Sequence, residues 1–314
     1  MNARNRSQLL SLAIAIAGLF PFSINAQQDP MYTMYMWNMM AINPAYAGSA
    51  DVLNVTALSR AQWANIPGAP VTHSISAHAP VNRQSLALGM GLVSDRIGRT
   101  GTSSAFGDVA YRTRITPKMR LSFGLKFGLN HAQVNNTQLQ NIDPEDPLFL
   151  TDQSDQLVPN FGAGIYLWST RSYFGVSVPK LRRNYLGSVE NENSNTLFAQ
   201  ESPHLFITGG YVIECGTVKI KPAFMLRMTE GAPPSGDLSV NVLLRDRFWI
   251  GSAYRNGSNV SGIFSIQLND QFRAGYAYDL CLDPLMIGGR SSQEIMLSYD
   301  PIFNRDRIRS PRYF

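Results

Sequence analysis

Residues 121–130 of this 314-residue chain read LSFGLKFGLN. Every second residue is large and apolar, whereas the residues between them are small or polar. Successive side chains of an extended strand point to opposite faces, so the pattern predicts a strand with one apolar face and one polar face. A helix, with its period of 3.6 residues, would scatter the same apolar side chains around its whole circumference.

The same alternation recurs along the chain, for example at 86–92, 161–167 and 272–278. It marks about fourteen strands of roughly ten residues, which is the length of a tilted strand that crosses a bilayer. The expected strands lie near residues 52–63, 70–80, 84–95, 101–115, 119–133, 157–168, 171–180, 203–214, 217–228, 237–245, 247–256, 259–269, 271–280 and 291–300.

The links between these expected strands alternate in length. Links after even-numbered strands are short: Asn82-Arg83, Pro117-Lys118, Thr170-Arg171, Cys215-Gly216, Asp246 and Asp270. Links after odd-numbered strands are mostly longer: 65–69, 96–100, 135–156, 181–202, 230–236 and 281–290. Short turns at one end, long loops at the other and an even strand count are typical of closed up-and-down barrels in outer membranes.

Composition supports a membrane barrel. Charged residues make up 16% of the chain, against about 25% in soluble domains. No apolar stretch after residue 26 approaches the roughly 18 residues that a membrane helix needs. We therefore expect an all-β, transmembrane, up-and-down antiparallel barrel over residues 51–300, located in the outer membrane. A soluble sandwich or propeller also alternates, so a secreted β-protein such as an adhesin stays open as an alternative.

The first 26 residues read as a secretory signal. Arg4 and Arg6 precede an apolar run from Leu9 to Phe22, and a small residue, Ala26, follows. We expect cleavage after Ala26, and no cysteine follows that would anchor a lipoprotein. The formal net charge of +5 then falls to +3 without any basic block, so nucleic acid is not an expected partner.

Residues 27–50 break the alternating pattern. The segment is rich in methionine and in aromatic residues, which include Tyr32, Tyr35, Trp37 and Tyr46. A stretch this apolar would not stay solvated. Two interpretations stay open, a plug or cap packed on the periplasmic end of the barrel and a docking segment for a partner.

Few residues suggest chemistry. His73 and His78 would face opposite sides of one strand, which is a poor arrangement for shared metal binding, while His131 and His204 are isolated. The acidic stretch 143–155 matches no calcium motif, and we expect it to be an exposed loop. We find no phosphate-binding loop, nucleophile elbow or zinc motif, so we expect no catalytic residue, metal or cofactor, and no enzyme.

The two cysteines, Cys215 and Cys281, would lie at opposite ends of the expected barrel. The apolar band of such a barrel is about 25 Å tall, whereas a disulfide needs Cα atoms within about 7 Å of each other. We therefore expect no bond between them.

The mature start, QDPMYTMYMWN followed by INPAYAG at 42–48, resembles the PorP/SprF family of type IX secretion and gliding-motility membrane proteins. The stretches SRAQW at 59–63 and GAPVTHSISAH at 68–78 agree, as does the ending RSPRYF at 309–314. The resemblance covers essentially the whole mature chain, and its N-terminal blocks are specific.

The resemblance implies a non-enzymatic outer-membrane subunit of the type IX system, which exports proteins with C-terminal signal domains. The implied partners are the periplasmic ring lipoprotein and its partner, a peptidoglycan-binding periplasmic protein and the exported cargo, beside outer-membrane lipid. We expect any lumen to be filled by the N-terminal segment and by side chains, given the inward Lys126, Lys219, Lys221, Arg227 and Arg273. The alternative is a porin or ligand channel that uses these basic residues to favour anions.

The tail 301–314 follows the last expected strand and would lie in the periplasm. It is basic, and two interpretations stay open: a solvated extension, or a partner contact in which its arginines form bidentate pairs with carboxylates. Together with the N-terminal aromatic residues it supplies the candidate partner contacts: Tyr32, Tyr35, Trp37, Tyr46, Arg305, Arg307, Arg309, Arg312 and Phe314.

Overall fold

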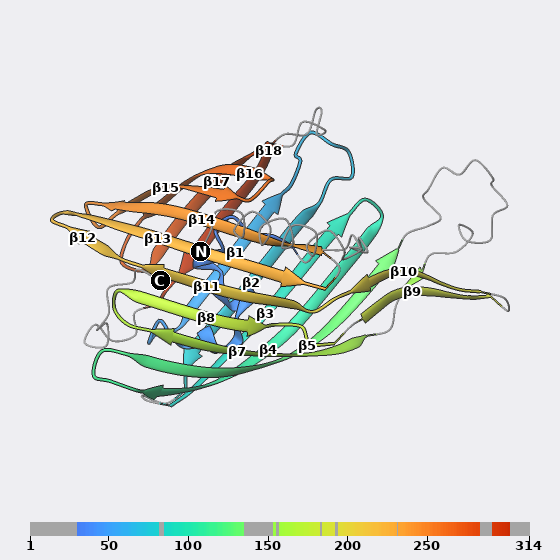
Figure 1. The fold of residues 1–314 in the computed structure, drawn as a ribbon, viewed down its shortest axis with the longest axis horizontal. Coiled ribbons are helices and arrows are strands. Elements are labelled where there is room, and N and C mark those ends of the chain that lie inside the picture. Colours follow the sequence, from blue (N-terminus) through green and yellow to red (C-terminus); the bar gives the residue numbers. More distant parts are fainter. Residues whose placement is uncertain are drawn as a thin grey trace, which may run out of the picture.

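The chain forms a closed antiparallel β-barrel with fourteen strands in the part of the chain that is described (Figure 1). The computed structural model describes residues 30–81, 85–134, 153–154, 157–182, 184–191, 194–230, 232–282 and 291–301. The expected signal segment, the acidic stretch 143–152 and the tail beyond residue 301 therefore lie outside the described residues.

The barrel strands follow one another around the ring in chain order. They are β1 (Asn54–Ala61), β2 (Val71–Pro80), β3 (Leu86–Ile97), β4 (Thr100–Arg114), β5 (Arg120–Val134), β7 (Val158–Trp168), β8 (Ser172–Val178), β11 (His204–Tyr211), β12 (Ile213–Cys215), β13 (Val218–Thr229), β14 (Ala232–Leu244), β15 (Phe248–Arg255), β16 (Asn259–Gln267), β17 (Phe272–Cys281) and β18 (Ser291–Tyr299). β11 and β12 form one strand interrupted at Val212, because both pair with β13. Pairing of β1 with β18 closes the ring, so no strand edge is left open to lipid.

Burial of the side chains confirms the predicted faces. On β5, Phe123 is 48% exposed and Leu125 is 68% exposed on the outer surface, whereas Ser122 is fully buried. The other apolar rows that the sequence analysis singled out also face outward. A soluble sandwich would bury these residues between two sheets, so the barrel carries an apolar outer belt suited to hydrocarbon.

The two ends of the barrel differ as predicted. At the short-turn end, tight turns such as 216–217 and 245–247 join the strands. At the long-loop end, longer segments join β5 to β7 and β8 to β11. The second of these contains a hairpin, β9 (Asn184–Asn191) with β10 (Ser194–Glu201), which the sequence analysis treated as loop. A two-residue strand, β6 (Gln153–Ser154), pairs with the end of β5.

Two expected links at the long-loop end are shorter than predicted. β3 and β4 are joined through Gly98-Arg99 only, where Gly98 adopts a φ of 58° that favours glycine. β14 starts at Ala232 rather than at residue 237, although Pro233 and Pro234 follow. The neighbouring β15 pairs with β14 only as far as Asp237. On that side no carbonyl of β15 therefore lies opposite the two prolines to accept the hydrogen bond that proline cannot donate.

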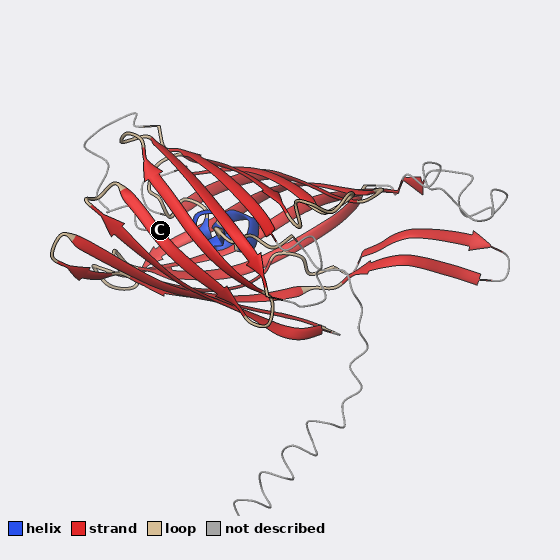
Figure 2. Cartoon of the chain, turned by 90° about the horizontal axis from the view of Figure 1, so that it is seen from above, coloured by secondary structure: helices blue, strands red, loops and turns tan. Residues whose placement is uncertain are grey.

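None of the helices in the described residues has the length and apolar character needed to cross a membrane. The helical turns are short and all fall near the N-terminus: η1 (Tyr35–Trp37), α2 (Met39–Ile42) and η2 (Pro44–Tyr46). Figure 2 shows them inside the barrel.

Candidate functional site: the N-terminal segment inside the barrel

Residues 30–51, here named the lumen segment, run inside the barrel from its long-loop half to its short-turn end. Residues 32–40 and 42–48 are all buried. The segment then joins β1 at the short-turn end. Hydrogen bonds and ion pairs from the strands hold it at three levels: an upper level toward the long-loop end, a middle level, and a lower level at the short-turn end.

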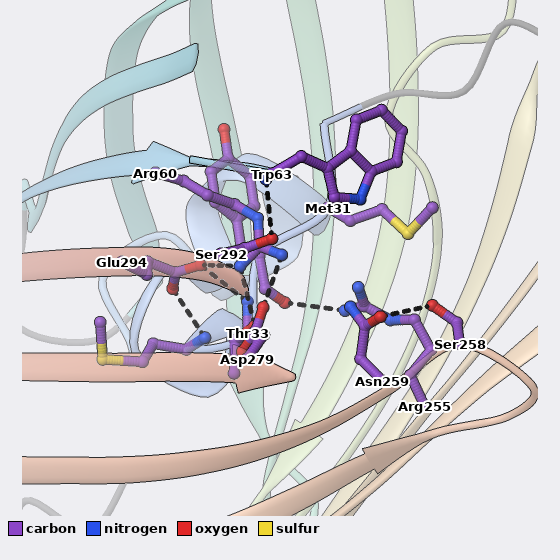
Figure 3. Close-up of polar contacts among 12 residues, drawn as sticks. Met31, Thr33, Arg60, Trp63, Arg255, Ser258, Asn259, Asp279, Ser292 and Glu294 are labelled. Atoms are coloured by element: carbon purple, nitrogen blue, oxygen red, sulfur yellow. Dashed lines mark hydrogen bonds and ion pairs between the residues drawn. The ribbon is translucent and has the colours of Figure 1, made fainter. Parts of the chain in front are cut away.

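At the upper level, one arginine and two carboxylates fix the start of η1 (Figure 3). Arg60 on β1 pairs with Asp279 on β17 at 2.6 Å and with Glu294 on β18 at 3.0 Å. Glu294 also accepts hydrogen bonds from the backbone N–H groups of Thr33 at 2.9 Å and Met34 at 2.7 Å. Arg60 carries one positive charge against two carboxylates, and these two N–H donors stabilise the remaining negative charge by hydrogen bonding.

The hydroxyl of Thr33 completes this cluster. It donates to Asp279 at 2.8 Å and accepts from Arg60 at 2.9 Å. Arg60, Asp279 and Glu294 are each at most 2% exposed. Buried charges cost several kcal/mol each unless they are paired, so the cluster is stable only while all its members are present.

A second ion pair lies beside this cluster. Arg255 on β15 holds Asp237 on β14 through two hydrogen bonds, from Nε at 2.6 Å and from Nη2 at 3.1 Å. The same Nη2 also donates to the carbonyl of Tyr32 at 3.4 Å. Figure 3 shows Arg255 close to the Thr33 cluster. The barrel strands thus contact the backbone of the lumen segment at three consecutive residues.

At the middle level, glycines in the barrel wall let the lumen segment lie directly against the strands. A Cβ at Gly124 would come within 2.2 Å of the backbone nitrogen of Ala45, and one at Gly164 within 2.2 Å of Oδ1 of Asn43. Asn43 uses the space to donate to the carbonyl of Ile165 at 3.0 Å while it accepts from Ala45 N–H at 2.9 Å. Lys126 donates to the carbonyl of Met40 at 3.0 Å.

This close approach predicts the effect of filling the space. Gly124→Val should destabilise the folded protein by about 1–3 kcal/mol and displace the lumen segment, because the obstacle is backbone and cannot rotate away. Gly262→Val is the matched control, since a Cβ at Gly262 meets nothing within 4 Å. Urea unfolding and protease protection of residues 30–51 measure both effects. Equal stability and protection of the two variants would show that the segment does not lie against β5.

At the lower level, the segment is tied to the short-turn end. The backbone N–H of Gly48 donates to Nδ1 of His78 at 3.0 Å, and Arg112 donates to the Gly48 carbonyl. Asp51 accepts from Arg112 at 3.1 Å and from Arg120 at 2.7 Å. Gly48 has a φ of 73°, and a Cβ there would come within 2.4 Å of Ala87, so only glycine fits.

Aromatic rings fill the space between these levels. Trp37 packs edge-on against Trp249 at 6.2 Å between ring centroids, and Tyr46 packs against Tyr166 at 5.4 Å. The four aromatic candidate residues Tyr32, Tyr35, Trp37 and Tyr46 are thus all at most 7% exposed inside the barrel. The other candidates, Arg305, Arg307, Arg309, Arg312 and Phe314, lie outside the described residues.

Little space is left around the lumen segment. Inward residues toward the short-turn end, including Ser122, Asn241 and Ser265, have no exposed surface. A cavity of about 90 Å³ lies in the long-loop half, between the lumen segment and the wall, where Met31, Lys126 and Arg227 contribute to its lining. Lys126 and Arg227 both contact the segment, since Arg227 lies 2.7 Å from the sulfur of Met31.

The remaining candidate residues for chemistry do not gather. His73 is exposed on the outer surface and His78 is buried in the lumen, which confirms their predicted opposite orientations. Among the described residues no group of three or more His, Cys, Asp or Glu side chains could hold a metal ion. Cys215 and Cys281 are both free, and the strand order places them at opposite ends of the barrel.

Sequence reasoning missed the residues that hold the lumen segment. Arg60, Asp279 and Glu294 each sit on the inward face of a strand, which the alternation alone could have indicated. Their mutual contact depends on strand pairing, because Arg60 is 219 residues from Asp279 in the chain. A single charged residue on the inner face of a wide barrel is equally compatible with a water-filled lumen.

Comparison with known proteins finds a matching family and solved structures of similar fold. The family model described as type IX secretion system membrane protein PorP/SprF matches residues 24–299. None of the curated proteins compared with the chain matches it. Solved structures with a similar fold include the Acinetobacter baumannii outer membrane protein Omp33, at 8% identity and a TM-score of 0.44, covering 80% of this chain and 98% of that one. A Pseudomonas aeruginosa FadL homologue has 12% identity and a TM-score of 0.47, covering 82% and 92% respectively.

The family match extends from before the lumen segment to the end of the last barrel strand, β18. It therefore includes the inward residues that hold the lumen segment as well as the outer belt. The chain belongs to the PorP/SprF family of type IX secretion system membrane proteins and resides in the outer membrane.

Proposed function

We propose that this protein is a non-enzymatic subunit of the type IX system that acts as an outer-membrane scaffold and not as the conduit for cargo. The observation that carries the proposal is the filled lumen, which residues 30–51 occupy and the inward charged residues hold. A barrel closed in this way offers its rims, loops and termini for function. It supports export of proteins with C-terminal signal domains by joining other components.

We further propose that the partners are the periplasmic ring lipoprotein and its partner, together with a peptidoglycan-binding periplasmic protein. By the rule that short turns of outer-membrane barrels face the periplasm, the short-turn end would meet them. Exposed cations gather there, including Lys118, Arg171 and Arg247. The basic tail leaves from the same end, because β18 finishes at Tyr299.

The tail is the stronger candidate for the contact than the N-terminal aromatic residues. Tyr32, Tyr35, Trp37 and Tyr46 pack against the barrel wall, so a partner could reach them only after release of the lumen segment. The arginines of the tail could bind carboxylates of a partner without any such change.

Affinity isolation from gently solubilised membranes tests this proposal. The full chain should co-purify with periplasmic ring components. Deletion of residues 302–314, or the substitutions Arg305→Gln, Arg307→Gln, Arg309→Gln and Arg312→Gln together, should reduce the recovered ring components by about tenfold or more, since several charge-assisted hydrogen bonds are lost. Arg99→Gln with Arg182→Gln removes two exposed charges from the opposite, long-loop end and serves as the control, with unchanged recovery expected.

Two results would count against the proposal. Recovery of no ring component with the full chain would reject the scaffold role. Normal recovery with the tail variants, in a barrel that still folds, would reject the tail as the contact and leave the turns or the lumen segment to be tested. The alternative of an anion-favouring porin is addressed by the conductance measurement described in the Discussion.

A further inference from the structure

The outer surface of strands β1 to β5 carries a polar row directly above apolar ones. Strand pairing aligns Ser59 with His73, His73 with Ser94, Ser94 with Ser103, and Ser103 with His131. All five alternate with inward residues, so they share the outer face. This row lies toward the long-loop end, which is the external end if the short turns face the periplasm.

The rows on either side define a boundary. The next row toward the short-turn end is mostly apolar and consists of Ala57, Ile75, Leu92, Ala105 and Leu129. The next row toward the long-loop end is mixed and consists of Ala61, Val71, Arg96, Gly101 and Gln133, and Arg99 follows in the turn. The change from apolar to polar within two residues on five adjacent strands marks the surface of the outer leaflet on this side of the barrel.

A groove crosses this boundary. Small residues, Ser94, Ser103 and Ala105, lie between larger ones on β2 and on β5, and the resulting groove has a volume of about 480 Å³. Its lower part is lined by Ile75, Leu92 and Leu129, and His73 and His131 lie at its upper part. An apolar groove that opens toward hydrocarbon and ends at a polar row has the form of a site for one acyl chain and its headgroup.

The charges indicate the headgroup. The polar row and the mixed row beyond it include His73, His131 and Arg96 but no carboxylate among the described outward-facing residues. His73 is oriented by Ser59, whose hydroxyl lies 2.9 Å from Nδ1, so a serine that donates there leaves Nε2 as an N–H donor. The two histidines are three strands apart, about 14 Å, which suits a headgroup wider than a single phosphate.

We propose that this groove binds an outer-leaflet glycolipid with a phosphorylated disaccharide headgroup. One acyl chain lies over Leu92 and Ala105, and the phosphates are bound by the cationic and N–H donor groups of Arg96, His73 and His131. The proposal is independent of the scaffold role, because the site faces lipid and involves neither terminus. It implies that the protein is held at a fixed depth and orientation in the membrane by a specific lipid.

Lipid binding by the full-length protein in a neutral detergent tests the site. Native mass spectrometry would measure retention of purified lipid A, of the same lipid A after dephosphorylation, and of phosphatidylglycerol. Ser94→Leu with Ser103→Leu fills the groove, and Ser252→Leu adds the same side chain on the exposed outer face of β15, outside the groove. A third variant, His73→Ala with His131→Ala and Arg96→Ala, removes the headgroup donors.

We expect lipid A to bind the wild type and the Ser252→Leu control equally. Binding should fall by about tenfold or more in the headgroup variant, because it loses the donors of three side chains to the charged phosphates. It should fall by a similar factor in the groove-filled variant, because the two leucines exclude the acyl chain. Dephosphorylated lipid A should bind the wild type as weakly as lipid A binds the headgroup variant. Equal binding by all variants, or equal binding of phosphatidylglycerol and lipid A to the wild type, would overturn the proposal.

Discussion

Replacing Arg60 with alanine should destabilise the folded barrel by about 3–5 kcal/mol, because Asp279 and Glu294 then stay buried without their counter-charge. Both carboxylates are at most 1% exposed, so water cannot take the place of the guanidinium without opening the structure. We expect the upper part of the lumen segment to detach from the wall, since Thr33 also loses its hydrogen bond from Arg60.

Urea unfolding followed by tryptophan fluorescence measures this effect, because Trp37 and Trp249 are buried in contact with each other. The matched control is Arg171→Ala, which breaks an ion pair with Glu214 whose side chains are 54% and 36% exposed. Exposed pairs of this kind contribute at most about 1 kcal/mol, so the control should change stability little. Equal effects of the two substitutions would contradict the buried cluster.

Arg60→Lys separates charge from geometry. Lysine restores the positive charge but cannot make the two separate contacts of the planar guanidinium with Asp279 and Glu294. Its stability should therefore lie between those of the wild type and Arg60→Ala.

Most of the barrel was predictable from the sequence because its rules are local. The alternation in LSFGLKFGLN needs only neighbouring residues to assign Phe123 and Leu125 to the outer face. Link lengths gave the strand order, since adjacent antiparallel strands joined by short turns pair with each other. The hairpin of β9 and β10 was missed because its polar sequence, NYLGSVEN and SNTLFAQE, lacks the regular apolar face of the barrel strands.

The contacts of the lumen segment were not predictable in the same way. Gly124 and Gly164 appeared in the sequence only as small residues on the inner face of strands, which a water-filled pore would equally allow. Their role is to leave space for Asn43 and Ala45, which lie directly against them in the folded barrel. The segment could be expected to fill the lumen because it is too apolar to stay solvated, but its individual contacts depend on partners more than 100 residues away, such as Ile165 and Glu294.

The second large effect concerns conductance. Deletion of residues 30–47 should convert a closed barrel into an open pore, because it removes the residues that fill the lumen while every barrel strand is kept. Folding of the deletion variant is checked by its migration on gels before and after heating. If the deletion variant does not fold, Gly124→Val replaces it, since its lumen segment cannot lie against β5.

Planar-bilayer recording of the purified wild-type protein is the most direct test of the filled lumen. We predict no steady openings for the wild type and stepwise openings of porin size for the folded variant with the displaced or deleted segment. Large, steady, anion-favouring openings of the wild type would contradict the account and would support the channel alternative.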